Sequence, residues 1–144
     1  MFDMPIKNLM ESKKLIRLEP QTMVNEAAKR MESKNVGAVL VVEGTQLLGI
    51  FTERDAVFRV LAKGLDAKTT SLRDVMTTPP ATLPPHSTYG HALMVMHDKG
   101  FRHVPVVEDG KVIGIITARN AMDPALEDFV SEARRREHYR EEPV

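Results

Sequence analysis

The residues best suited to chemistry in this sequence lie in two related segments, GIFTERDA (residues 49–56) and GIITARNA (residues 114–121). Both segments keep a glycine, a threonine and an arginine at the same spacing, and they close on Asp55 in the first and Asn120 in the second. These side chains are strong hydrogen-bonding groups, suited either to holding a helix end or to binding a polar ligand. Each segment follows an apolar run, so the sequence presents the same polar turn at the end of a strand twice.

These two turns belong to an internal duplication. Residues 18–56 repeat at 83–121 with a constant offset of 65 and no gap, and 14 of the 39 aligned positions are identical. A repeated unit must share one fold, so each copy tests what is inferred from the other. Half of the chain, about 60–65 residues, would be marginally stable alone, which favours two copies packed face to face.

Each repeat is expected to begin with an amphipathic helix. In the first copy the helix follows Thr22, a good N-cap, and in the second it follows Ser87. Asn35 and Gly100 are suited to the left-handed turn that ends such a helix. The apolar residues at helical spacing are Met23, Val24, Ala27, Ala28 and Met31 in the first copy and Tyr89, Ala92, Leu93 and Met96 in the second.

A strand hairpin should follow each helix. VGAVLVV (36–42) and HVPVV (103–107) read as buried strands, EGTQ and EDGK as turns, and LLGIF and VIGII as return strands. Pro105 cannot donate to a ladder, so we expect it at the strand start or on an edge. A second helix should begin at Thr52 and at Thr117, with Val57, Val60 and Leu61 forming an apolar face in the first copy.

Shorter segments flank the repeats. Short extended segments precede the repeats at 15–18 and 81–83. The lead-in segments KNLM (7–10) and RDVM (73–76) are similar to each other, one residue out of register with the repeat. Residues 63–72 have the composition of a linker. From Asp123 a further amphipathic helix is predicted through Leu126, Phe129, Val130 and Ala133. It should end in a solvated, frayed tail, RRREHYREE.

Composition narrows the class of protein. The chain has 144 residues, 20 basic and 20 acidic residues that cancel, and no cysteine. The balanced charge argues against a nucleic-acid surface driven by bulk charge, and the lack of cysteine excludes disulfides and thiolate chemistry. No apolar run approaches the roughly 18–20 residues of a membrane span, and no signal peptide is visible, so we expect a cytoplasmic protein.

The two polar turns allow a structural and a functional interpretation. Thr-x-x-Asp after a strand resembles a capping box, which would need no ligand, although Glu or Gln is the usual fourth residue. Gly49 and Gly114 are poor strand residues and often mark the close approach of a ligand or of another backbone. The residues alone leave capping and binding equally open.

The whole arrangement resembles a tandem pair of cystathionine-β-synthase (CBS) domains, whose signature at this junction is Gly-hydrophobic-x-Thr-x-x-Asp or Asn. The lead-in methionine, the Pro-Val-Val strand and the signature occur in order over about 120 of the 144 residues. The resemblance implies an α/β (α+β) fold of two βαββα units, a Bateman module, packed about a pseudo-twofold axis. It places one domain at residues 5–64, a second at 70–122 and a C-terminal helix and tail at 123–144.

The resemblance also implies clefts that bind adenosine-containing ligands such as AMP, ADP, ATP, S-adenosylmethionine or NAD, as regulators and not as catalytic cofactors. By position, Asp55 and Asn120 would hold ribose, and Thr52 and Thr117 would make the neighbouring polar contacts. Basic residues before the Pro-Val-Val strand reach phosphate in the family, which points to Arg102 and His103. The candidate ligand-binding residues are therefore Gly49, Thr52, Arg54, Asp55, Arg102, His103, Gly114, Thr117, Arg119 and Asn120.

The two sites should differ. A carboxylate accepts from both ribose hydroxyls while an amide offers one acceptor oxygen, so the Asp55 site should bind ribose more strongly than the Asn120 site. Arg102 and His103 are replaced by Gly37 and Ala38 in the first copy, which implies one phosphate-rich cleft and one without this anchor. Arg54 and Arg119 are present in both copies, where surface salt bridges would explain them equally well.

Other chemistry finds little support. The histidines at 86, 91, 97 and 103 lack the spacing of a metal site, and no P-loop, GxGxxG or GxSxG motif suggests an enzyme. We therefore expect a stand-alone sensor that passes ligand occupancy to an unidentified regulated protein or to its own homodimer, without contact to membranes or nucleic acid. The alternatives are a ligand-free structural or interaction module and, more remotely, a nucleic-acid-associated regulator acting through the basic tail at 134–136.

Overall fold

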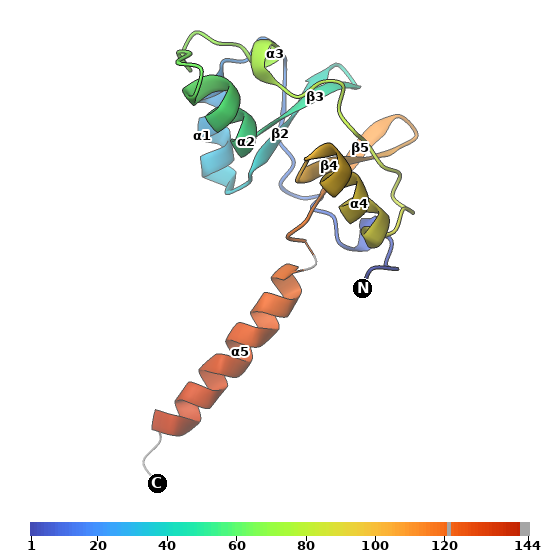
Figure 1. The fold of residues 1–144 in the computed structure, drawn as a ribbon, viewed down its shortest axis with the longest axis vertical. Coiled ribbons are helices and arrows are strands. Elements are labelled where there is room, and N and C mark those ends of the chain that lie inside the picture. Colours follow the sequence, from blue (N-terminus) through green and yellow to red (C-terminus); the bar gives the residue numbers. More distant parts are fainter. Residues whose placement is uncertain (121, 142–144) are drawn as a thin grey trace.

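The computed structural model describes residues 1–120 and 122–141, which form two α/β units side by side and one long C-terminal helix (Figure 1). The first unit contains β1 (Arg17–Leu18), α1 (Val24–Lys34), β2 (Ala38–Glu43), β3 (Gln46–Thr52), α2 (Glu53–Asp55), η2 (Ala56–Leu61) and α3 (Leu72–Val75). The remaining elements are η1 (Ile6–Asn8), α4 (Tyr89–Lys99), β4 (His103–Glu108), β5 (Lys111–Thr117) and α5 (Met122–Glu141). The predicted fold of two related α/β units followed by a helix is confirmed.

The central strand of the first unit is β2, which pairs in parallel with β1 and antiparallel with β3. Its first four residues are all buried because both of its faces are covered. Val39 and Val41 face the helices of their own unit, whereas Ala38 and Leu40 join a core shared with Ile115 of the other unit. The hairpin therefore contributes to the core of its unit and to the contact between the units.

The second unit repeats this hairpin but loses the lead-in strand. In the first unit the N–H of Leu40 donates to the carbonyl of Ile16 at 2.8 Å. Pro105 holds the equivalent position and has no N–H, so β4 cannot make this bond. The lead-in pairing is accordingly reduced to a single bridge between Leu83 and Val106. Pro105 lies inside β4, and β5 is the one strand paired with β4 in the described sheet, as expected for proline on an edge.

The two lead-in segments are exchanged between the units. Ile6 donates its N–H to the carbonyl of Ser87 at 2.8 Å, and Glu11 and Ile115 exchange two backbone hydrogen bonds of 2.9 Å, so the N-terminal segment lies on the second unit. The segment after the linker lies on the first unit, where Thr77 and Ile50 exchange bonds of 2.8 and 3.1 Å. Each unit is thus completed by the segment that precedes the other.

The hydrophobic core follows this exchange. The core of the first unit contains Leu72, Val75 and Met76 from the segment after the linker, packed with residues such as Phe51 and Val60. The core of the second unit contains Ile6 from the N-terminal segment, packed with Leu83, Tyr89, Ala92, Met96, Val104, Val106 and Ile116. The echo between residues 7–10 and 73–76 in the sequence therefore marks two equivalent packing segments.

The first helix of each repeat starts one residue later than predicted. The N-cap of α1 is Met23, not Thr22, and no side chain caps it. The N–H groups of Val24 and Asn25 instead donate to the carbonyls of Thr70 and Ala67 in the linker, both at 2.9 Å, which removes the need for a capping hydroxyl. Thr88, not Ser87, caps α4 by accepting from the N–H of His91. The left-handed ends at Asn35 and Gly100 are confirmed.

The second helix of the first repeat begins after Thr52 as predicted and continues as the π-helix η2. Of the three residues expected to form an apolar face on this helix, Val60 is buried while Val57 and Leu61 are 48% and 72% exposed. The i→i+5 hydrogen bonds of η2 rotate successive residues less than an α-helix does. Val57 and Leu61 therefore share an outer face, and Val60 points to the core.

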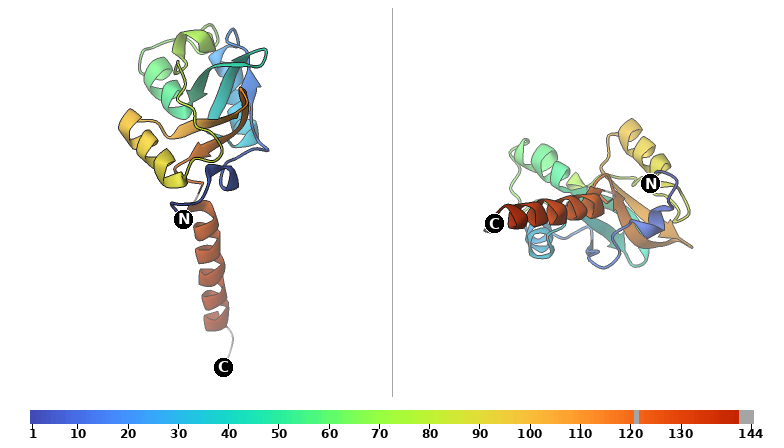
Figure 2. Two further views of the ribbon diagram at one scale, coloured as in Figure 1. Left: turned by 90° about the vertical axis from the view of Figure 1, so that its right-hand side faces the viewer. Right: turned by 90° about the horizontal axis from the view of Figure 1, so that it is seen from below.

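The second helix of the second repeat does not begin at Thr117. Residues 118–120 form a turn, and α5 starts at Met122, within one residue of the start predicted at Asp123. Figures 1 and 2 show α5 extending away from both units. The tail predicted to be frayed is helical as far as Glu141, supported by ion pairs from Glu132 to Arg135 (3.1 Å) and Arg136 (3.4 Å). Within the described chain no helix is long and apolar enough to cross a bilayer.

Candidate functional site

The first polar turn forms a complete capping box. The hydroxyl of Thr52 accepts from the N–H of Asp55 at 3.2 Å, and Oδ2 of Asp55 accepts from the N–H of Thr52 at 3.0 Å. These reciprocal bonds satisfy two backbone donors at the start of α2. The shorter aspartate therefore fills the role that glutamate usually takes, and this turn caps a helix in the first repeat.

The remaining acceptor positions of Asp55 are also occupied. The hydroxyl of Thr77 donates to both carboxylate oxygens at 3.1 and 3.3 Å, and Nε of Arg59 lies 3.4 Å from Oδ1. Arg59 further donates to the carbonyl of Met76 at 3.0 Å. Asp55 is only 5% exposed, so this carboxylate joins α2 to the exchanged segment and is turned away from solvent.

The second turn uses the same residues differently. Oδ1 of Asn120 accepts from the N–H of Thr117 at 2.6 Å, but the hydroxyl of Thr117 accepts from the N–H of Arg119 at 3.2 Å. The hydroxyl of Tyr89 donates toward the carbonyls of Thr117 and Ala118, at 3.0 and 2.9 Å. The amide side chain is half-buried, so the two turns differ in burial as well as in charge.

The two signature glycines make room for the exchanged segments. A Cβ on Gly49 would lie 2.7 Å from the carbonyl oxygen of Thr77 and 2.8 Å from Sδ of Met76. A Cβ on Gly114 would lie 3.0 Å from the carbonyl oxygen of Glu11 and would collide with the side chain of Met10. Of the two causes considered for these glycines, the close approach of another backbone is the one that the structure shows.

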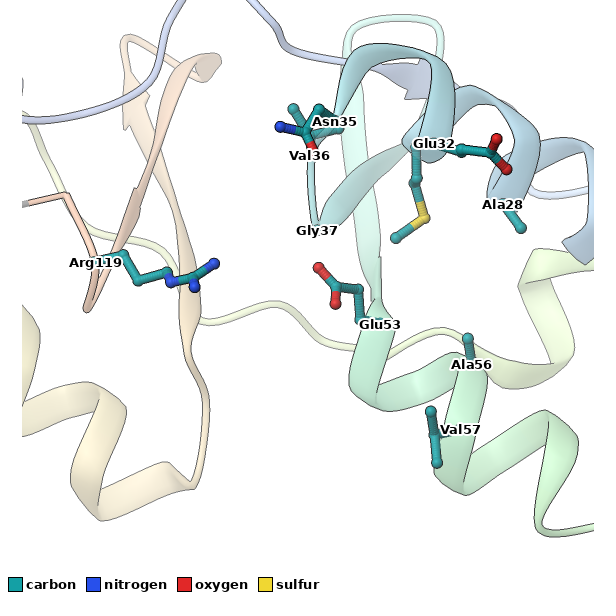
Figure 3. A pocket seen from close by; sticks show the side chains of 10 residues that line it. Ala28, Glu32, Asn35, Val36, Gly37, Glu53, Ala56, Val57 and Arg119 are labelled. Atoms are coloured by element: carbon teal, nitrogen blue, oxygen red, sulfur yellow. The ribbon is translucent and has the colours of Figure 1, made fainter. Parts of the chain in front are cut away.

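A first pocket, the repeat-one pocket, opens between the units (Figure 3). Its volume is about 520 Å³, within the usual range for small-molecule sites. Figure 3 shows Arg119 extending from the second unit toward the side where Glu53 points into the opening. The lining residues are Ala28, Met31, Glu32, Asn35, Val36, Gly37, Glu53, Ala56, Val57 and Arg119.

A second pocket, the repeat-two pocket, is related to the first by the duplication. Its volume is about 420 Å³. Seven of its eight lining residues lie 65 positions after residues of the repeat-one pocket, and the eighth, Arg54, is the counterpart of Arg119. The lining residues are Arg54, Leu93, Met96, His97, Gly100, Phe101, Arg102 and Ala118.

Each pocket receives an arginine from the opposite repeat. Arg54 follows β3 of the first unit but lines the repeat-two pocket, and Arg119 follows β5 of the second unit but lines the repeat-one pocket. The guanidinium of Arg54 lies 4.5 Å from the centroid of the Phe58 ring, a cation–π contact that holds its side chain. A ligand in either pocket would therefore touch both repeats.

The charges of the two pockets are opposite. The repeat-two pocket is lined by Arg54, Arg102 and His97. The repeat-one pocket carries Glu32 and Glu53 against the single Arg119. The difference predicted between a phosphate-rich cleft and one without the anchor thus has a counterpart in the geometry, and it extends to residues that sequence reasoning did not identify.

Arg102 and His103 are adjacent in sequence but lie in different surroundings. Arg102 lines the repeat-two pocket, whereas Nε2 of His103 approaches Gly37 of the first repeat. Burial lowers the pKa of His103 below its usual value of 6.5, and Arg102 lowers it further, while Glu53 and Asp55 act in the opposite direction. His103 therefore lies where the two repeats meet and is absent from the lining of both pockets.

The structure brings only part of the predicted site together. Arg54 and Arg102 share one pocket and Arg119 lies in the other, while the remaining predicted residues line neither: Gly49, Thr52, Asp55, His103, Gly114, Thr117 and Asn120. Sequence reasoning missed Glu53, His97 and Phe101 as lining residues. At the offset of 65 these residues correspond to Ala118, Glu32 and Val36, and this difference between the repeats was visible in the sequence.

Sequence reasoning also missed the two partners of the buried carboxylate. Arg59 and Thr77 both contact Asp55. Neither residue has an identical counterpart in the other repeat. At the offset of 65, Arg59 corresponds to Pro124. Thr77 bridges to Ile50 as Glu11 bridges to Ile115, so Glu11 is the counterpart of Thr77. In the part of the chain that the structure describes, no group of three or more His, Asp or Glu side chains is placed to hold a metal ion.

Two α/β units with pseudo-equivalent pockets between them define a paired-repeat module. The CBS domain model matches residues 6–62 and 72–126, so this chain belongs to the CBS domain family as a tandem pair. A relative described as an uncharacterized protein of Methanopyrus kandleri is 35% identical over 105 residues, covering 72% of this chain. The chain spans about half of that relative, 54% of its length.

Solved structures show the same architecture. An uncharacterized conserved protein from Pyrococcus horikoshii superposes with a TM-score of 0.80 at 28% identity, covering 87% of this chain and 94% of its own. A CBS domain protein from Pyrobaculum aerophilum complexed with AMP superposes with a TM-score of 0.73 at 21% identity, covering 81% of this chain and 89% of its own. The latter likeness concerns the fold alone.

Proposed function

We propose that this CBS pair is a cytoplasmic, non-catalytic regulatory module that binds a phosphate-bearing, adenosine-containing ligand in the repeat-two pocket. The observation that carries this proposal is the meeting of Arg54 from the first repeat and Arg102 from the second in one pocket. Two guanidinium groups with fixed charge are well suited to phosphate, because each can donate two parallel hydrogen bonds. His97 also lines this pocket.

The remainder of this pocket suits the nucleoside. Leu93, Met96 and Phe101 provide an apolar wall, and the volume of about 420 Å³ accommodates a nucleotide. These side chains can pack against the face of adenine, which AMP, ADP, ATP and NAD share, so all four are candidates. That the structurally similar protein from P. aerophilum is complexed with AMP supports this ligand class.

Binding in this pocket would link the repeats. Arg54 is attached to the first unit and Arg102 to the second, so a phosphate held by both favours one relative orientation of the units. A ligand shifts a conformational equilibrium only by its differential affinity for the two states, and a bridging contact provides such a difference. We propose that this orientation is read by a partner protein or by the homodimer.

Isothermal titration calorimetry with AMP, ADP, ATP, NAD and S-adenosylmethionine tests the proposal. At least one phosphate-bearing ligand should bind, and Arg54→Ala and Arg102→Ala should each weaken it by about tenfold or more, since hydrogen bonds to charged groups contribute ~1.5–3 kcal/mol. Arg30→Ala is a matched control, because Arg30 is an exposed arginine of α1 outside both pockets. Absence of binding at millimolar ligand, or full affinity in both pocket variants, would falsify the assignment.

The ribose roles of Asp55 and Asn120 stay predictions. Asp55 would have to exchange the hydroxyl of Thr77 or the guanidinium of Arg59 for ribose hydroxyls. The same occupied carboxylate favours the second candidate, a structural or interaction module whose pockets stay empty. The two candidates separate in the titrations above, because the ligand-free module predicts no heat with any of the five compounds.

A further inference from the structure

The two pockets differ in charge at three equivalent positions. Gly37, Glu53 and Glu32 in the repeat-one pocket correspond at the offset of 65 to Arg102, Ala118 and His97 in the repeat-two pocket. At each of these positions the residue of the repeat-one pocket is more acidic than its counterpart in the repeat-two pocket. The wall that presents Arg102 in one pocket therefore presents a carboxylate in the other.

In the repeat-one pocket Gly37 lies directly against this carboxylate. The backbone N–H of Glu53 donates to the carbonyl of Gly37 at 3.0 Å, which brings the two residues together. Oε1 of Glu53 lies so near Gly37 that a Cβ there would overlap it. A side chain at position 37 would therefore have to displace the end of the Glu53 side chain. Figure 3 shows the Glu53 carboxylate directed into the pocket.

We propose that Glu53 determines the specificity of the repeat-one pocket: it excludes phosphate and selects a ligand whose corresponding end is a cation. This inference rests on the proposed function, in which Arg102 holds the phosphate end of the ligand in the repeat-two pocket. By pseudo-symmetry the same end of a ligand in the repeat-one pocket faces Glu53, with Glu32 adding a second negative charge. A dianionic phosphate is repelled there, and an ammonium is attracted.

Arg119 does not reverse this preference. It extends from the second unit on the far side of the opening, and it is the one basic residue against two carboxylates in the described lining. Its place corresponds to that of Arg54, which in the other pocket acts together with Arg102. The repeat-one pocket therefore has half of the phosphate-binding pair, with the other half replaced by Glu53.

The first experiment measures how many AMP molecules bind per chain and where. Calorimetry of the full chain should give one AMP per chain. The variant Glu53→Gln should admit a second, and its loss in the double variant Glu53→Gln, Arg119→Ala would place it in the repeat-one pocket. Two equivalent AMP sites in the unaltered chain would overturn the inference while leaving the proposed function intact.

The second experiment uses 5′-amino-5′-deoxyadenosine, which carries an ammonium where AMP carries a phosphate. It should bind the unaltered chain, and Glu53→Gln should weaken it by about tenfold, the size expected for losing one charge-assisted contact. Glu26→Gln, an exposed glutamate of α1 outside both pockets, should leave its affinity unchanged. Thermal melting verifies that each variant is folded.

The outcomes of the second experiment do not depend on AMP. If no AMP binds anywhere, the proposed function fails, yet binding of the amino compound that requires Glu53 still supports the selection of a cation. If the amino compound does not bind, or binds equally to the Glu53→Gln variant, Glu53 does not select the ligand and the inference is wrong.

Discussion

Arg54 and Arg119 occupy equivalent positions in the two repeats, and each lines the pocket of the other repeat. Had each arginine lined its own pocket, ligand binding would have had no necessary effect on how the units are arranged. With the arginines exchanged, ligand affinity and the relative orientation of the units become linked quantities.

Removing the Phe58 ring should weaken phosphate binding through Arg54. The ring lies 4.5 Å from the guanidinium and is 51% exposed, so the contact contributes about 0.5–1 kcal/mol, or a two- to fivefold change in Kd. Phe58→Ala should therefore reduce AMP affinity by this factor in calorimetry. In an Arg54→Ala background the same change should have no effect, and an equal loss in both backgrounds would contradict a positioning role.

Replacing Asp55 should destabilise the first unit. Asp55→Ala removes the capping box and leaves the N–H of Thr52 and the hydroxyl of Thr77 without their partner, a loss of about 1–3 kcal/mol in the free energy of unfolding. Asp55→Asn keeps one acceptor oxygen and should lose about half as much. Arg59 is half exposed at 51%, so its ion pair adds little. Urea denaturation measures the free energies of unfolding of the two variants, and equal stability of both would argue against the cap.

Adding a methyl group at the signature glycines should be costly. Gly49→Ala forces a Cβ against the carbonyl of Thr77 at 2.7 Å and should lower the free energy of unfolding by about 1–3 kcal/mol. Gly114→Ala meets mainly the flexible side chain of Met10 and should lose less. Gly90→Ala in α4 is the comparison: the nearest atoms, of Phe2, would lie at 3.3 Å, and alanine favours a helix, so it should lose less than Gly49→Ala. Tolerance of Gly49→Ala would show that the exchanged segment can move away.

The stability of the protein should fall in mildly acidic solution because of His103. Burial lowers the pKa of this imidazole in the folded chain below the 6.5 of the unfolded chain. The folded state then binds fewer protons, so stability is complete above pH 6.5 and decreases as the pH falls below it. Between pH 7.5 and 5.5 the melting temperature of His103→Gln should decrease less than that of the unaltered chain. His86→Gln, at an exposed position, should not differ from it.

The proposed homodimer should depend on α5 and the outer face of η2. Phe129 on α5 is 68% exposed, and Val57, Phe58 and Leu61 on η2 are 48%, 51% and 72% exposed. A homodimer would cover these side chains. Deleting residues 123–144 should shift the sedimentation coefficient toward that of a monomer, and Leu61→Glu should do the same by placing a charge on the face. An unchanged coefficient in both variants would exclude these surfaces.

Much of the fold was predictable because the duplication allowed each element to be inferred twice. The left-handed helix ends at Asn35 and Gly100, the hairpins and the helix start after Thr52 follow from local residue preferences, and all are present. The capping residue of α1 was not predictable in the same way. Its first N–H groups bind the carbonyls of Thr70 and Ala67, a long-range contact that no local pattern at Thr22 reveals.

The site was less predictable than the fold, for a physical reason. Arg102 precedes β4 and lines the repeat-two pocket, whereas His103 begins β4 and approaches Gly37 of the first repeat, so the two separate although they are neighbours in sequence. The signature residues near Asp55 serve the helix cap, and each pocket is lined instead by the first helix of its repeat, the residues that follow that helix and the arginine of the other repeat. That exchange of arginines requires the packing of the two units, which a single repeat does not encode.

The exchanged lead-in segments have a consequence for cutting the chain. A break in the linker near Gly64 and Leu65 would leave one fragment that carries Ile6, needed by the second unit, and another that carries Leu72, needed by the first. Neither fragment contains a whole core, so the nicked protein should persist as a complex of two mutually dependent pieces. The boundary between repeats is therefore not a boundary between folding units, and the chain is suited to division into complementing fragments that assemble only when both are present.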